Sequence, residues 1–166
     1  MLRKMLLPLV LLAAVVAGAA GARAETVRVP LTGPASFTLE VPAGWTATYA
    51  ENGTLRLAAD DKSAQVQLSI IGVDAGTTAA ALAEGIKPPA VGTTPYAKPV
   101  PAKIAGLAGQ EFSLRLGDEA TLSLVLVKMD ATSYAAQTTL RRTGITPVQL
   151  ALLKALLALV KVAKGE

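Results

Sequence analysis

The sequence has no cysteine and no histidine among its 166 residues. Without cysteine, neither a disulfide nor a lipid-modified N-terminal cysteine can form, so stability must come from the core alone. Ser-His-Asp and Cys-His nucleophile systems and the usual zinc sites are excluded as well. The side chain best suited to proton transfer near neutral pH is also absent. We therefore expect a non-catalytic protein with no cofactor and no metal site.

The one long apolar run lies near the N-terminus, over residues 5–20. Arg3 and Lys4 precede it, and residues 22–24 (ARA) place small side chains at the two positions that a signal peptidase reads. This pattern predicts a secretory signal peptide over residues 1–24, cleaved after Ala24. An uncleaved anchor is the alternative, but the run is shorter than the about 20 residues of a membrane span. We expect a periplasmic or secreted protein with no membrane span after cleavage.

Charge gives no indication of an ionic partner. The chain has 16 basic and 12 acidic residues, and three of the basic ones (Arg3, Lys4 and Arg23) leave with the signal peptide. The remaining 13 basic residues nearly balance the 12 acidic ones, which provides no electrostatic footprint for nucleic acid or an anionic membrane. We expect residues 25–166 to form one domain, to be monomeric, and to bind no nucleic acid.

Polar and apolar residues alternate over most of the mature chain, as in half-buried strands. The alternation predicts seven strands, over residues 36–41, 45–51, 54–59, 64–70, 110–116, 120–129 and 133–142. Asn52-Gly53 is a strong hairpin signal and joins the second strand to the third, so the first three strands should form a meander. Residues 25–35 are expected to be a leader without regular structure.

Two helices are predicted between and after these strands. Residues 77–86 fit a short helix capped by Thr77 or Asp74, and residues 87–101 follow as a connector with five prolines. Residues 146–162 form a long apolar helix that begins at a Thr146-x-x-Gln149 capping box with Pro147 in the first turn. Its apolar side should lie in the core. The residues assigned to that side are Leu150, Leu153, Leu157 and Val160, widened by Leu152, Leu156 and Leu159.

The order of these elements predicts an α+β fold: a single antiparallel sheet of six to seven strands, packed by the long C-terminal helix and one shorter helix. Three stretches resemble the PsbP-like family, which includes the photosystem II lumenal subunit and a small Ran-binding nuclear import factor. They are residues 37–45 (FTLEVPAGW), 103–112 (KIAGLAGQEF) and 133–139 (SYAAQTT). The resemblance covers most of residues 36–162 and implies this fold, an exported protein, and binding more than catalysis.

Few residues stand out as sites. The adjacent acids Asp60-Asp61 and Asp118-Glu119 are in predicted turns, where solvated carboxylates are ordinary. Trp45 either binds a ligand or caps the rim of the core. The proline-rich connector either offers a polyproline II surface or only joins two elements.

The strands predict one polar face and one apolar face in the second half of the sheet. The apolar residues Phe112, Leu114, Leu122, Leu124, Leu126, Tyr134, Ala136 and Leu140 should face the helices. The polar residues Glu111, Ser113, Arg115, Thr121, Ser123, Gln137, Thr139 and Arg141 should share the other face, open to solvent. That face is either ordinary surface or, through Arg115 and Arg141 with Arg142 at the strand end, a docking patch.

Three function classes follow. The leading one is a non-catalytic exported binding or accessory domain whose partner is an envelope or secreted protein, with Arg115, Arg141, Arg142 and Trp45 as candidate contacts. A carrier of a small apolar ligand would need a cavity under the final helix. An unusual carboxylate-dependent hydrolase would need an acid pair in a pocket.

Overall fold

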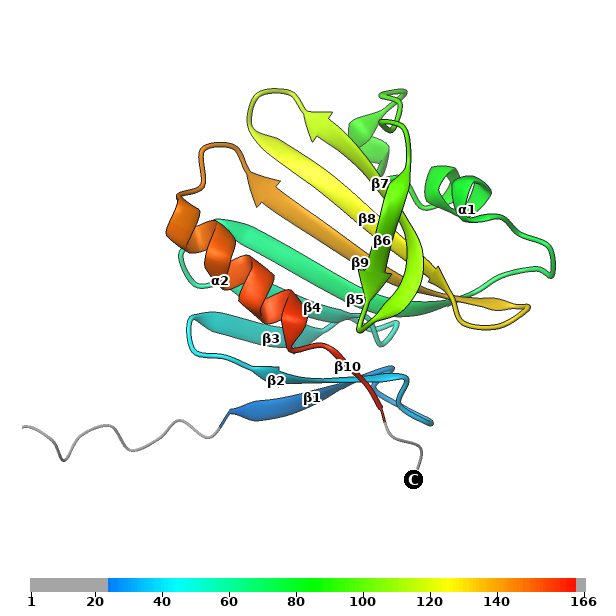
Figure 1. Ribbon diagram of the computed structural model, residues 1–166, viewed down its shortest axis with the longest axis horizontal. Coiled ribbons are helices and arrows are strands. Elements are labelled where there is room, and N and C mark those ends of the chain that lie inside the picture. The colour runs from blue at the N-terminus through cyan, green and yellow to red at the C-terminus, as the bar shows by residue number, and fades with distance from the viewer. Residues whose placement is uncertain (1–23, 164–166) are drawn as a thin grey trace, which may run out of the picture.

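The computed structural model describes residues 24–163, so the predicted signal peptide lies outside the described residues except for Ala24. The chain forms a large and a small antiparallel sheet (Figure 1). The large sheet has the order β3-β4-β5-β9-β8-β7-β6. Its strands are β3 (Trp45–Tyr49), β4 (Leu55–Ala59), β5 (Ala64–Gly72), β6 (Val100–Ile104), β7 (Leu107–Leu116), β8 (Ala120–Lys128) and β9 (Ser133–Arg142). The predicted α+β fold with a seven-stranded antiparallel sheet is confirmed.

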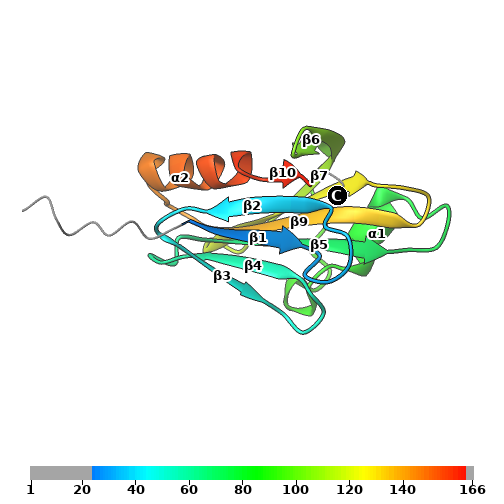
Figure 2. The same ribbon diagram turned by 90° about the horizontal axis from the view of Figure 1, so that it is seen from below.

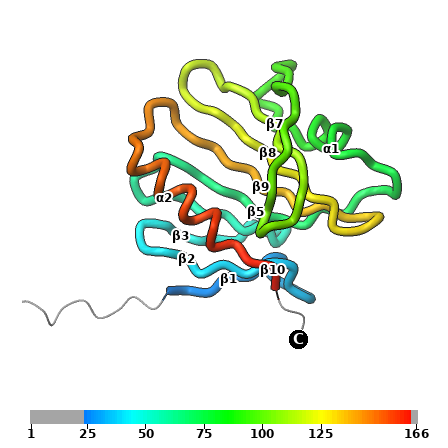
Figure 3. The backbone as a smooth tube through the Cα atoms, viewed as in Figure 1, coloured from blue at the N-terminus to red at the C-terminus, as the bar shows by residue number. Residues whose placement is uncertain are grey.

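The small sheet is a feature that the sequence did not predict. It has the order β1-β2-β10 and joins β1 (Glu25–Val29), β2 (Phe37–Val41) and β10 (Lys161–Val162), so both ends of the described chain meet in it (Figure 3). The expected pairing of residues 36–41 with 45–51 is wrong, because β2 pairs with β1 and β10 instead of β3. Val27 and Val29 bury their side chains in the main core, which stabilises a strand where a leader was expected.

The edge strand β6 is not among the predicted strands; its first two residues, Val100 and Pro101, end the predicted proline-rich connector. Pro101 lies within β6 and pairs with Gln110 of β7. Proline is tolerated at a sheet edge, where its missing N–H can face away from the neighbouring strand. The connector contains a short 3-10 helix at Pro89–Val91 and ends two residues earlier than predicted, where β6 begins at Val100.

The long helix is α2 (Pro147–Ala158), and its capping box is present. The backbone N–H of Gln149 donates to the Thr146 hydroxyl at 3.2 Å, and the backbone N–H of Thr146 donates to Oε1 of Gln149 at 2.8 Å. The helix ends four residues before the predicted boundary, and β10 follows it. Its buried residues are Leu153 and Leu156, whereas Leu152 is 54% exposed. The part of the chain that the structure describes has no helix long and apolar enough to cross a membrane.

The two helices cover opposite faces of the large sheet (Figure 2). α2 and the small sheet close the main core, in which Leu153 and Leu156 pack with Val66, Leu68 and Val127. The short helix α1 (Ala79–Gly85), capped by Thr78 and not by Thr77 or Asp74, packs on the other face with Phe112, Leu124 and Leu126. The expectation that the long helix covers the Phe112 face is therefore wrong, and so is the expectation that the polar face lies open.

Candidate binding groove

A groove of about 380 Å³ lies between α2 and the face of the sheet formed by β7, β8 and β9. We call it the helix groove. Its volume is at the lower end of the range for small-ligand pockets in proteins. Polar residues of the sheet form the floor: Glu111, Ser113, Thr121, Ser123, Gln137 and Thr139. The helix forms an apolar wall with Leu150, Leu153 and Leu157, and Lys154 lies beside them.

The strand register orders the floor into three cross-strand rows. The rows are Arg115–Thr121–Arg141, Ser113–Ser123–Thr139 and Glu111–Val125–Gln137. Directly opposed residues on one face of antiparallel strands have Cβ atoms about 5 Å apart, so each row is a contiguous strip. The predicted polar face is thus confirmed as a face. What the sequence did not indicate is that a helix stands over it.

Two polar side chains of the floor, Gln137 and Thr139, are largely buried but keep their polar atoms open to the groove. Gln137 is 6% exposed and Thr139 is 9% exposed. No hydrogen bond joins either side chain to another residue of 24–163, although both can donate and accept. Neither has a completely sealed polar atom, so these groups reach solvent through the helix groove, which they line. Because these donors and acceptors reach the groove and make no hydrogen bond to another residue of 24–163, they are free to bind a ligand there.

The groove carries an excess of positive charge. Lys103, Arg141 and Lys154 line it, and Arg115 lies in the same cross-strand row as Arg141. In the described range the single ion pair is Lys87–Glu84, so none of these four cations has an acidic partner within 4.0 Å. The one acid of the floor, Glu111, accepts a hydrogen bond from the Ser123 hydroxyl at 2.5 Å.

The other predicted contact residues lie elsewhere. Arg142 follows Arg141 on β9 and therefore points to the opposite face, where it lines an open depression of about 990 Å³ with Asp60 and Asp118. Trp45 lies on β3, half-buried against the main core. The structure places Arg115 and Arg141 in one cross-strand row on the same face, with Thr121 between them, and separates Arg142 and Trp45 from them.

The acid pairs gather around that depression, since Asp60, Asp118 and Glu119 line it. All three are exposed, and Asp61 beside them has a lowered pKa because the Ser63 hydroxyl and N–H donate hydrogen bonds to its carboxylate. A general acid needs the opposite, a carboxyl whose pKa is raised by an apolar site. No group of three or more acids in residues 24–163 is close enough to hold a metal ion.

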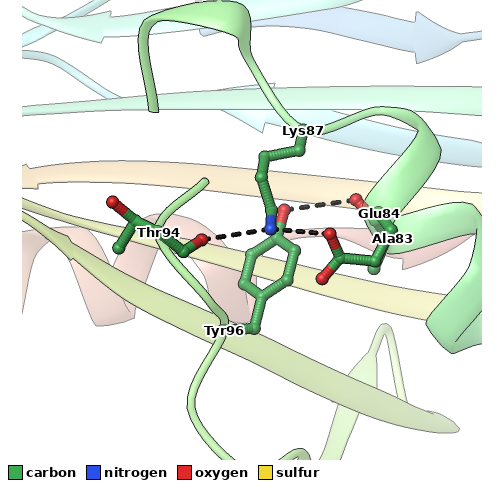
Figure 4. Close-up of polar contacts among 5 residues, drawn as sticks. All are labelled: Ala83, Glu84, Lys87, Thr94 and Tyr96. Carbon is green, nitrogen blue, oxygen red and sulfur yellow. Dashed lines mark hydrogen bonds and ion pairs between the residues drawn. The ribbon is translucent and has the colours of Figure 1, made fainter. Parts of the chain in front are cut away.

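An apolar cavity of about 290 Å³ lies on the opposite face, under the proline-rich connector. Its lining includes Pro88, Val91, Leu122 and Leu124, so it is not under the final helix, where an apolar-ligand carrier was expected to have one. Lys87 links the connector to α1. Its amine binds the Glu84 carboxylate of α1 at 2.6 Å and the Thr94 carbonyl of the connector at 3.1 Å (Figure 4).

Tyr96 completes this attachment of the connector. The Lys87 amine lies 4.7 Å from the centre of the Tyr96 ring. The Tyr96 hydroxyl donates a hydrogen bond to the Ala83 carbonyl at 3.3 Å. Burial raises the pKa of Tyr96, and the negative charge of Glu84 adds to the effect. The connector segment around Tyr96 is therefore anchored to the domain, which disfavours its use as a free polyproline II surface.

No protein-family model matches the sequence, and no curated protein does. Solved structures do match. The solution structure of cyanobacterial PsbP (CyanoP) from Synechocystis is 10% identical, with a TM-score of 0.57 over 88% of this chain and 96% of that one. A crystal structure from Bacteroides thetaiotaomicron is 13% identical, with a TM-score of 0.53 over 86% of this chain, which spans 49% of that protein. At these identities the matches establish the fold, and the chain has the PsbP-like fold.

Proposed function

We propose that the chain is an exported, non-catalytic binding domain that takes part of an envelope or secreted protein into the helix groove. The observation that carries this proposal is the pair Gln137 and Thr139, more than nine-tenths buried on the groove floor and without a hydrogen-bond partner in residues 24–163. Their donors and acceptors face the groove and are open to hydrogen bonds from a ligand. A partner that supplies the missing hydrogen bonds explains them.

The lack of histidine and cysteine in the whole sequence supports the non-catalytic part of the proposal. The exposed acids around Asp118 do not provide the paired environments that a carboxylate-dependent hydrolase needs. The apolar cavity under the connector keeps a small-ligand carrier as the second candidate, because its lining is mostly apolar. It ranks second because no buried polar group there lacks a partner.

The variant Gln137→Leu tests the proposal, because it removes the amide at nearly constant volume. We expect it to melt at the same temperature as the wild type or higher, since the Gln137 amide makes no hydrogen bond to another residue of 24–163 that the substitution would remove. Capture of the partner from an envelope extract should fall about tenfold, as a lost hydrogen bond in a buried site predicts. Mass spectrometry of the captured protein identifies the partner.

The matched control is Gln110→Leu, which changes an exposed glutamine on the opposite face of β7 and should leave capture unchanged. A Gln137→Leu protein that melts lower and still captures the partner would mean that Gln137 is a packing residue, and the proposal would be wrong.

A further inference from the structure

We infer that the helix groove binds a short acidic segment of its partner. The inference rests on the proposed function and adds the chemistry of the occupant. The hydrogen-bonding floor, the two arginines at one end and the leucine wall must all be matched by one ligand. A peptide that carries a carboxylate beside an aliphatic side chain has all three complementary features.

The charges indicate where the carboxylate binds. Arg115 and Arg141 flank Thr121 in one row, with Lys154 of α2 lining the same groove. Two strand spacings separate the backbones of the two arginines, which is about 10 Å, so both long side chains can reach one anion. Glu111 lies two rows away from Arg115, and four residues along a strand are about 13 Å, too far to neutralise these arginines. Arginine binds carboxylates through paired N–H donors, which favours an acid over a neutral partner.

The floor and the wall indicate a peptide around that acid. The Gln137 amide and the Thr139 hydroxyl each offer a donor and an acceptor, which match backbone N–H and C=O groups. Leu150 and Leu157 are half-buried on the wall and leave apolar surface for an aliphatic side chain. A free amino acid or inorganic anion would leave this wall unused.

The test measures the fluorescence anisotropy of a labelled octapeptide of alternating leucine and glutamate, beside a peptide with glutamine in place of each glutamate. We expect the acidic peptide to bind the mature protein at least about tenfold more tightly than the neutral one. Arg141→Gln should lower the affinity for the acidic peptide about tenfold. Arg115→Gln, at an exposed position that folding tolerates, should also weaken binding. Arg56→Gln, an exposed arginine on β4 that does not line the groove, is the matched control and should change nothing.

The outcomes separate this inference from the proposed function. Equal binding of both peptides, unchanged in Arg141→Gln but lost in Gln137→Leu, would overturn the acidic occupant and leave the groove as the binding site. Competition by free sodium glutamate as effective as that of the acidic peptide would identify a small carboxylate as the ligand and overturn the peptide. No binding of either peptide would overturn the inference, while partner capture by the wild type and its loss in Gln137→Leu would still support the proposed function.

Discussion

At the residue scale, Asp61 connects the β4–β5 turn to the start of α2. Its carboxylate accepts hydrogen bonds from the Ser63 N–H at 2.9 Å and from the Gln149 side-chain amide at 3.0 Å. Gln149 is also the third residue of α2 and the partner of Thr146 in its capping box. One exposed carboxylate thus contributes to the position at which the groove-forming helix begins.

Acidification should reveal this contribution. The hydrogen bonds from Ser63, then from Gln149, hold the pKa of folded Asp61 below its ordinary value of 3.8. The folded state therefore binds fewer protons than the unfolded state, so the stabilisation is present above pH 3.8 and is lost as the pH falls through the folded pKa. Between about pH 5 and about pH 3, the melting temperature of the wild type should fall further than that of Asp61→Asn. Equal falls in the two proteins would show that these hydrogen bonds do not contribute to folding.

At the element scale, α2 contributes to the core along a narrower stripe than its composition indicates. Leu153 is 4% exposed and Leu156 is fully buried, but Leu152, one residue earlier, is 54% exposed. Leu157 is half-buried because it lies partly on the wall of the helix groove. The apolar excess of this helix is therefore divided between the core and a surface that a ligand can reach.

Leu→Ala substitutions at different positions of α2 should therefore change the stability of the protein by different amounts. Leu156→Ala should destabilise the protein by about 2–5 kcal/mol, as large-to-small changes in a core do. Leu152→Ala should change stability by less than about 0.5 kcal/mol, because the side chain is already largely in solvent. Urea unfolding of both variants checks this, and similar midpoints would mean that α2 packs on the sheet through a different side.

At the scale of the whole molecule, the small sheet joins the two ends of the described chain. β2 pairs with β1 on one side and with β10 on the other (Figure 3). Val29 and Phe37 from this sheet share the main core with Leu156 and Val160. The segment that runs from α2 into β10 is therefore held at its far end, which limits how far α2 can move from the groove floor.

The first strand of the small sheet is compatible with the predicted signal-peptide cleavage. β1 begins at Glu25, the first residue after the predicted cleavage site. Cleavage after Ala24 leaves β1 complete. We therefore expect the mature protein in the envelope fraction of a bacterial host to begin at Glu25, as N-terminal sequencing would show. If the protein in that fraction begins at Met1, the N-terminal apolar run is an uncleaved anchor and the predicted cleavage is wrong.

The amino-acid sequence by itself determined most of the strands, the capping box of α2, the polar and apolar faces of β7–β9, and the absence of the usual catalytic side chains. These depend on local chemistry and on the two-residue repeat of a strand. Local patterns do not state which face a helix covers or which distant strands pair. The tertiary structure decided both, because Val125, Val127 and Ala135 continue the apolar surface of β5 on the face that also carries Gln137. That surface buries α2, and so the helix stands over a polar floor that alternation alone left open to solvent.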